Sequence, residues 1–232
     1  MSAEKTDVIV LGGGFAGLSC AAALAERGAR VVLLEKKPHL GGRAYSFKDP
    51  RTGELVDNGQ HLFMACYRHT RAFLRRIGTE GLLRFPAGVR VDYAGADGRR
   101  DALKCPAGLP APFHLLWGVL GMKRLSWADK ASLLKLDWAM RGCPECGGRE
   151  RLDAVTVRAW MDSIGLGRGL QETLFDPIAI GALNDLPDTA SALGLVQVLR
   201  EAFYSGAENS RLGFATVGLS ELYAGAARRF IE

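Results

Sequence analysis

The chain has 232 residues, of which 48% are hydrophobic and 24% charged, and its formal net charge is +5. This composition is typical of a globular protein with a core and excludes a disordered or fibrous chain. The positive charge forms no basic run interleaved with aromatic residues, which excludes a nucleic-acid partner. Five cysteines without a secretory signal exclude a disulfide framework. Because no stretch approaches the roughly 18 to 20 apolar residues of a membrane span, we expect a cytoplasmic protein.

The first 35 residues predict a nucleotide-binding unit. An apolar run over Val8–Leu11 predicts a strand, and it leads directly into Gly12-Gly13-Gly14-Phe15-Ala16-Gly17, a G-x-G-x-x-G pattern. An alanine-rich helix is expected over 18–27, then a second strand over 31–34 that ends on Glu35. Strand, glycines, helix, strand and acid in this order are typical of a Rossmann-type dinucleotide site.

Each residue type in this unit has a physical reason. Gly12 allows the tight turn, Gly14 lets the backbone approach a pyrophosphate, and Gly17 lets the helix lie close to the strand. The free N–H groups and positive dipole end at the helix start favour phosphate. Glu35 can accept hydrogen bonds from a ribose hydroxyl and disfavours a 2′-phosphate, so FAD and NAD remain as the candidate cofactors.

The following elements are shorter. We expect a hairpin formed by residues 44–47 and 54–56 around a turn at 49–53, and a helix over 67–77. Further strands are expected over 89–93 and 102–104. An apolar stretch carrying Trp117 spans 113–120. A capping box at Ser126–Asp129 predicts a helix that runs to about residue 141, with Ala131, Leu134 and Trp138 recurring at helical spacing. The last expected helices are 156–164, 190–204 and 219 to the end.

The loop Leu40-Gly41-Gly42-Arg43 resembles the FAD-dependent amine oxidase and phytoene desaturase superfamily. In that superfamily this loop lies near the pyrophosphate and flavin of FAD. The residue chemistry agrees, because the Arg43 guanidinium offers a planar fork to phosphate oxygens and the two glycines permit close backbone approach. The resemblance therefore favours FAD as the cofactor.

Later motifs resemble one branch of this superfamily, the squalene-associated hydroxysqualene dehydroxylases. These motifs are V-D-N-G-Q-H-L-F-M-A-C-Y (56–67), F-D-P-I-A-I-G-A-L-N (175–184) and G-L-S-E-L-Y (218–223). The resemblance implies reductive removal of the hydroxyl group of hydroxysqualene, giving squalene for hopanoid synthesis. A carotenoid-type desaturase is the enzymatic alternative, and a non-catalytic FAD-binding scaffold is another.

The resemblance also implies a fold, partners and cofactor contacts. We expect an α/β, Rossmann-like FAD-binding segment over residues 1–82 and an α+β substrate-binding region over 83–232. A second flavin-binding segment is absent from the sequence, so we expect an N-terminal portion of a longer protein. Implied partners are an isoprenoid substrate, the inner face of the membrane and other enzymes of squalene synthesis. The predicted cofactor contacts are Gly12, Gly14, Phe15, Ala16, Gly17, Glu35, Lys36, Gly41, Gly42, Arg43, Ala44, Gly59, Gln60 and His61.

Several residues allow two interpretations. His61 is either a proton donor or a structural histidine, so the catalytic residue stays unassigned. Cys143 and Cys146 lack a second ligand pair, so we predict no metal site. Residues 113–122 are either a hydrophobic approach surface for substrate or a core helix. Asp176 and Asn184 are polar candidates in the substrate region, for which we favour structural roles.

Overall fold

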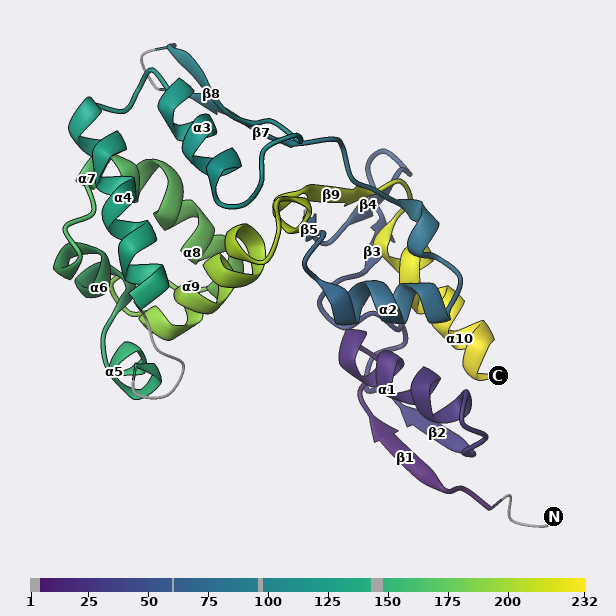
Figure 1. Ribbon diagram of the computed structural model, residues 1–232. Coiled ribbons are helices and arrows are strands. Elements are labelled where there is room, and N and C mark those ends of the chain that lie inside the picture. The colour runs from purple at the N-terminus through teal and green to yellow at the C-terminus, as the bar shows by residue number, and fades with distance from the viewer. Residues whose placement is uncertain (1–4, 60, 96–97, 143–147) are drawn as a thin grey trace. The chain divides into compact units, whose positions relative to one another are not determined.

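The computed structural model describes residues 5–59, 61–95, 98–142 and 148–232, and it divides them into two compact units (Figure 1). Unit 1 contains the chain up to Pro86 together with Leu212–Glu232, and unit 2 contains Ala87–Arg211. The sequence boundary at residue 82 lies close to the first division. The last 21 residues, however, join unit 1 rather than the predicted substrate region, because their strand and helix pack on the nucleotide-binding elements.

Unit 1 begins with the predicted strand–helix–strand element. Strand β1 (Val8–Leu11) pairs in parallel with β2 (Val31–Leu34), and helix α1 (Phe15–Ala25) connects them. The remaining elements of unit 1 are β3 (Ser46–Lys48), β4 (Leu55–Asp57), β5 (Phe63–Met64), α2 (Arg68–Arg76), a 3-10 turn (Glu80–Leu82), β6 (Leu83–Arg84), β9 (Leu212–Ala215), a π-helical turn (Ser220–Gly225) and α10 (Ala226–Ile231).

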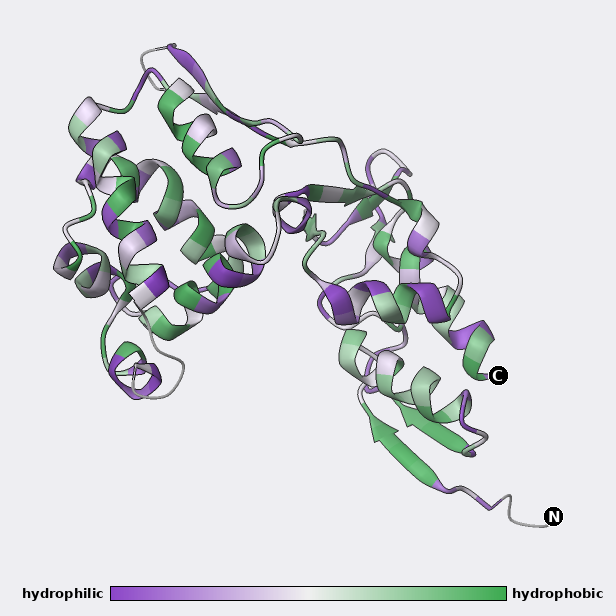
Figure 2. Cartoon of the chain, viewed as in Figure 1, coloured by the Kyte–Doolittle hydropathy of each residue, from purple (hydrophilic) through white to green (hydrophobic). Residues whose placement is uncertain are grey.

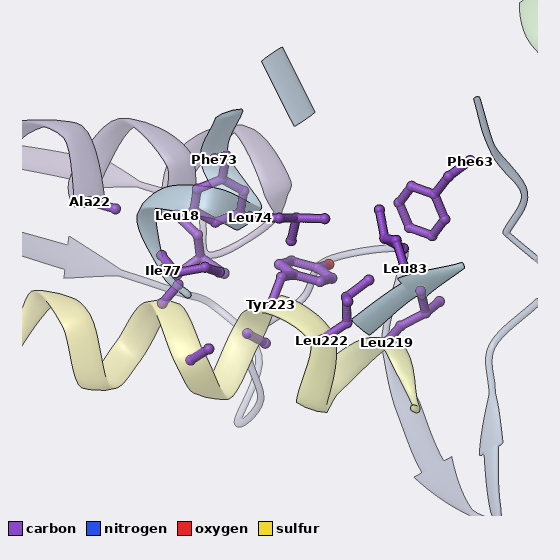
Figure 3. Packing of buried hydrophobic residues seen from close by; sticks show 13 residues of the cluster. Leu18, Ala22, Phe63, Phe73, Leu74, Ile77, Leu83, Leu219, Leu222 and Tyr223 are labelled. Carbon is purple, nitrogen blue, oxygen red and sulfur yellow. The ribbon is translucent and has the colours of Figure 1, made fainter. Parts of the chain in front are cut away.

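Segments that are distant in sequence are joined by short strand pairs. Strands β3 and β4 form the predicted antiparallel hairpin. Strand β9 lies between β5 and β6 and is antiparallel to both, so it ties the C-terminal segment to the N-terminal one. The core of unit 1 then forms where α1, α2 and the C-terminal helical segment meet; Figure 3 shows Tyr223 near the middle of this cluster, with Leu18, Phe73, Leu74 and Leu222 around it.

One face of the β1–β2 pair is bare. Both strands are hydrophobic along their length (Figure 2), but only the side chains on the α1 side approach burial. The side chains of Ile9, Leu11, Val32 and Leu34 are exposed, Leu11 by 78%. Parallel strands normally have both faces covered, so this face of unit 1 is a surface open to further packing.

Unit 2 combines one hairpin with helices, as the predicted α+β substrate region requires. Strands β7 (Val89–Ala94) and β8 (Arg100–Cys105) form the hairpin, and α3 packs on β8 (Figure 1). Its helical elements are α3 (Phe113–Gly121), α4 (Trp127–Gly142), α5 (Arg149–Asp153), α6 (Val157–Ser163), α7 (Arg168–Leu170), a π-helical turn (Gln171–Phe175), α8 (Asp176–Leu183), α9 (Ala192–Leu199), another π-helical turn (Arg200–Tyr204) and a 3-10 turn (Ala207–Ser210).

The predicted capping box opens α4. The Ser126 hydroxyl accepts a hydrogen bond from the Asp129 N–H at 3.1 Å, and the Asp129 carboxylate accepts one from the Ser126 N–H at 3.2 Å. Helix α4 buries Leu133, Leu136 and Met140, so Leu134 and Trp138 lie on its other, exposed side. Within the described residues, no helix is both long and apolar enough to cross a membrane.

Candidate functional site

The turn between β1 and α1 shows why two of its glycines are needed. Gly12 has a φ of +98°, a backbone conformation that side chains disfavour. At Gly17 a Cβ atom would lie 1.8 Å from the carbonyl oxygen of Gly12, so only glycine allows α1 to lie this close to the turn. Gly14 is different, because the nearest atom to a Cβ there is the Gly42 Cα at 3.8 Å. The chain itself therefore leaves the space at Gly14 open.

The N-terminus of α1 is free to bind an anion. The first intrahelical hydrogen bond is donated by the Leu18 N–H to the Gly14 carbonyl at 2.9 Å, so the N–H groups of Phe15 and Ala16 precede it. Gly14 is the N-cap and brings no side-chain oxygen, and the first turn contains no acidic residue. Unpaired N–H groups and the positive end of the helix dipole thus coincide at this point.

Glu35, at the end of β2, is fixed by the backbone. Its Oε2 accepts a hydrogen bond from the Gly13 N–H at 2.6 Å, and its Oε1 accepts one from the Lys37 N–H at 2.8 Å. These backbone hydrogen bonds lower the pKa of the Glu35 carboxyl, and the one from the Lys37 N–H has the largest effect. The carboxylate is therefore ionised at neutral pH, and each oxygen keeps a second lone pair with which to accept a hydroxyl proton.

A second glycine loop, Gly41–Ala44, touches the first. The Gly41 N–H donates to the Gly13 carbonyl at 2.8 Å. Gly41 and Gly42 have φ values of +113° and +61°, and a Cβ atom at Gly42 would lie 3.1 Å from the Gly14 Cα. Two sequence segments that were predicted to bind the same cofactor are therefore in direct backbone contact.

Tyr223 holds this second loop in place, and sequence reasoning did not identify it. Its hydroxyl lies 2.5 Å from the carbonyl oxygens of both Gly41 and Ala44, while its ring packs 4.1 Å from the Phe15 ring, centroid to centroid. Burial raises the pKa of the Tyr223 hydroxyl, so it remains a hydrogen-bond donor. The motif G-L-S-E-L-Y was the available signal, but nothing in the sequence connected it with Gly41.

The remaining predicted contact residues lie around these loops. The side chains of Lys36 and Arg43 are exposed, and among the described residues the Arg43 guanidinium has no ion-pair partner. Asn58 donates from Nδ2 to the Arg43 carbonyl at 3.1 Å, which joins Asn58 to the second loop. Gly59 is exposed on this segment, whereas Gln60 lies outside the described residues.

A small pocket of about 150 Å³ adjoins the glycine loops within unit 1. It includes three of the predicted residues, Phe15, Ala44 and His61, and its wall is completed by Leu62, Phe63, Tyr67, Thr70 and Leu219. The imidazole of His61 is therefore exposed at the edge of a mainly apolar pocket. That position suits either interpretation of His61, and no catalytic residue is assigned.

Asp176 and Asn184, the polar candidates of the substrate region, make contacts that stabilise the fold. Asp176 forms an ion pair with Arg158 at 2.7 Å, and their side chains are only 15% and 14% exposed. Asn184 adopts a left-handed conformation, φ 54°, at the C-cap of α8. Cys143 and Cys146 lie outside the described residues. Among the residues that are described, no group of His, Cys, Asp and Glu side chains has the arrangement of a metal site.

The site in unit 1 fits the phosphates and ribose of a dinucleotide. It offers an uncapped helix N-terminus, open space at Gly14 and an ionised carboxylate one strand away. Arg43 adds an exposed guanidinium from the second loop. The individual contacts remain predictions.

Comparison with known proteins agrees with this geometry. The sequence model of the family described as NAD(P)-binding Rossmann-like domain matches residues 10–77. The chain is 27% identical to a chloroplast 15-cis-phytoene desaturase from an Oncidium hybrid cultivar, over 91% of the chain and 36% of that protein. It is 30% identical to a hydroxysqualene dehydroxylase from Rhodopseudomonas palustris, over 92% of the chain and 47% of that protein.

Solved structures show the same fold. Cyclohexylamine oxidase from Brevibacterium oxydans superimposes with a TM-score of 0.67 at 21% identity, over 99% of this chain and 50% of that one. The chain thus spans half or less of the length of each of these three proteins. The sequence relatives are a desaturase and a dehydroxylase, and the superimposed structure is that of an amine oxidase. With its parallel strand pair and its two glycine loops, the chain belongs to the amine oxidase and desaturase superfamily.

Proposed function

We propose that this chain forms the dinucleotide-binding part, and a portion of the substrate region, of a flavin-dependent oxidoreductase that acts on a C30 isoprenoid. The observation that carries the proposal is the direct contact between the loops Gly12–Gly17 and Gly41–Ala44. The first loop alone suits NAD as well as FAD. The second glycine loop, with Arg43 on it, favours FAD.

When bound, FAD supplies two-electron hydride chemistry. The chain's own residues bind and orient it in this proposal. The N–H groups of Phe15 and Ala16 donate to phosphate oxygens, Glu35 accepts from a ribose hydroxyl, and Arg43 neutralises phosphate charge. The mainly apolar pocket beside Phe15 adjoins these cofactor-binding residues.

The reaction that we propose is the reductive dehydroxylation of hydroxysqualene. In this reaction the allylic C–O bond would be replaced by a C–H bond and the hydroxyl would leave with a proton as water; reduced FAD would supply the hydride that gives squalene. This assignment is supported by the R. palustris relative and by the later sequence motifs. A desaturation is the second candidate, supported by the phytoene desaturase relatives; there a double bond is gained and FAD is reduced.

The products distinguish the two reactions. The protein made from its complete reading frame is reduced without oxygen and mixed with hydroxysqualene, and the lipid extract is analysed by mass spectrometry. Squalene that forms only with reduced FAD supports dehydroxylation. Bound FAD without squalene, together with desaturation of phytoene by the oxidised protein, supports the second reaction. Bound FAD with neither reaction supports the non-catalytic FAD-binding scaffold, and failure to bind FAD contradicts all three alternatives.

A further inference from the structure

Helix α3 has a buried side and an exposed side within unit 2. Leu115 is buried whereas Trp117 is 63% exposed, so residues 113–122 include the core side that one interpretation of the sequence requires. Gly118 lets this helix lie close to β8, because a Cβ atom there would be 2.7 Å from the Cys105 Sγ. The adjacent Trp117 is thereby brought beside the hairpin, where its exposed indole lines a groove.

This groove has the size of a small-molecule site and a charged lining. Its volume is about 740 Å³, and ligand pockets in proteins span about 300 to 1,000 Å³. The wall is formed by the β7–β8 hairpin, by α3 and by the turn that follows α3. The charged side chains that line it are Arg90, Asp92, Arg100, Asp101, Lys104 and Lys123.

The register of the hairpin places cations next to one another. Arg90 is the cross-strand partner of Lys104, so the two side chains lie on one face of the hairpin with their Cβ atoms about 5 Å apart. Like charges in this position destabilise a strand pair. Arg100 lies on the same face of β8, four residues and about 13 Å from Lys104. A row of cations therefore follows β8, and a polyanion bound along it would relieve their repulsion.

The two carboxylates of the groove already have partners. Asp92 forms an ion pair with Arg90 at 2.8 Å. Asp101 accepts a hydrogen bond at Oδ1 from the Ala102 N–H and one at Oδ2 from the Arg124 N–H, each at 2.8 Å. The second of these bonds fastens the turn after α3 to β8. The carboxylates thus stabilise the walls of the groove, and they neutralise only part of its positive charge.

Three cations of the groove remain available for a ligand. Within the described part of the chain, Arg100, Lys104 and Lys123 have no ion-pair partner, and their side chains are exposed. Arg100 and Lys104 come from β8, whereas Lys123 comes from the turn after α3. Positive charge is therefore supplied by two different elements, and the indole of Trp117 lies in the same groove.

We infer that this groove, here called the unit 2 groove, binds a nucleoside di- or triphosphate. Lysine and arginine side chains bind phosphate oxygens through charge-assisted hydrogen bonds, and an exposed indole stacks on a flat base. A nucleotide uses both features, whereas inorganic phosphate uses only the cations. All residues of the groove belong to unit 2, while the glycine loops belong to unit 1. The inference therefore does not rest on the proposed reaction.

The test titrates ATP into the whole chain and follows the heat of binding. FAD is present in excess, so that ATP does not report on the glycine loops. We expect saturable binding of ATP. Tripolyphosphate, which lacks the base, should bind about tenfold more weakly, because stacking on an aromatic side chain contributes about 1–3 kcal/mol. Adenosine, which lacks the phosphates, should not bind detectably.

Variants separate the contribution of the ring from that of the charges. Trp117→Leu should weaken ATP binding about tenfold, whereas Trp117→Phe keeps a flat ring and should lose less than about threefold. Lys104→Gln and Lys123→Gln should each weaken binding about fivefold and reduce its salt dependence. The matched control is Arg151→Gln, because Arg151 is an exposed cation of unit 2 that does not line the groove. Its affinity for ATP should equal that of the unaltered protein.

Chemical acetylation of lysines locates the ligand on the unaltered protein, so this measurement holds even if a variant fails to fold. ATP should slow the acetylation of Lys104 and Lys123, read by mass spectrometry, and leave that of the exposed Lys48 in unit 1 unchanged. Absence of ATP binding, or binding that protects neither groove lysine, would overturn the inference. Equal affinity for ATP and tripolyphosphate would overturn the assignment to a nucleotide, as would protection of these lysines by anionic vesicles but not by ATP.

Discussion

The hydroxyl of Tyr223 lies 2.5 Å from the carbonyl oxygen of Gly41, so two residues 182 positions apart meet at the second glycine loop. Gly41 in turn donates its N–H to Gly13 in the first loop. The C-terminal segment therefore positions the loop that we expect to face the cofactor. This contact adds to the β9 strand pairs and the shared core that place residues 212–232 in unit 1.

Loss of the Tyr223 hydroxyl should destabilise unit 1. Tyr223→Phe keeps the ring packed against Phe15 but leaves the carbonyls of Gly41 and Ala44 without their donor in a buried site. We expect a loss of about 1–2 kcal/mol in the free energy of unfolding, measured by urea denaturation. The control is Tyr45→Phe, which removes a hydroxyl near the same loop where no hydrogen bond is described. An unchanged stability of Tyr223→Phe would show that the hydroxyl does not hold the loop.

Substitution by alanine should change the stability of the protein strongly at one glycine of the first loop and hardly at all at another. Gly17→Ala places a Cβ atom 1.8 Å from the Gly12 carbonyl oxygen and should lower stability by about 3 kcal/mol or more. Gly14→Ala meets no atom closer than 3.8 Å at an ordinary φ of −82°, so its stability should be nearly unchanged. Thermal unfolding followed by circular dichroism compares them. Equal melting temperatures for the two variants would contradict this account of the turn.

The Arg158–Asp176 ion pair should contribute more than the surface ion pairs. Arg158 also donates to Gln171 at 2.7 Å, and Asp176→Ala leaves its largely buried guanidinium with only a longer contact, 3.6 Å, to the exposed carboxylate of Asp188. We expect a loss of about 2–4 kcal/mol in the free energy of unfolding. The exposed pair Arg168–Glu172 is the control, and Glu172→Ala should cost less than about 0.5 kcal/mol. Urea unfolding in which both variants lose equal stability would contradict the structural role of Asp176.

His114 should make stability depend on pH. The imidazole is buried and its Nε2 lies 3.1 Å from the Ser210 hydroxyl; burial lowers the pKa of His114 below 6.5. As pH falls through 6.5, the unfolded chain takes up a proton that the folded chain resists, so stability is lost on acidification. His114→Gln should flatten this loss between pH 7 and 5, whereas exposed His69→Gln should not. If His114→Gln and the unaltered protein lost the same stability between pH 7 and 5, His114 would not be the source of the pH dependence.

The sequence predicted those parts of unit 1 that depend on local signals. The order β1, glycines, α1, β2, Glu35 was predicted correctly, because turn glycines and strand periodicity act over a few residues. The capping box at Ser126 was predicted correctly for the same reason. Tyr223 was missed because its partner is distant in sequence. Trp138 could not be placed on the exposed side of α4, since that helix has apolar residues on both sides.

The central claim is that the two glycine loops together bind FAD. The most direct test is titration of FAD into the protein made from its complete reading frame, followed by flavin fluorescence, with Gly14→Ala beside it. We predict saturable binding that Gly14→Ala weakens at least about tenfold at unchanged melting temperature, because the added methyl group occupies the space left for the pyrophosphate. Equal FAD affinity in both proteins, or no binding by either, would contradict the claim.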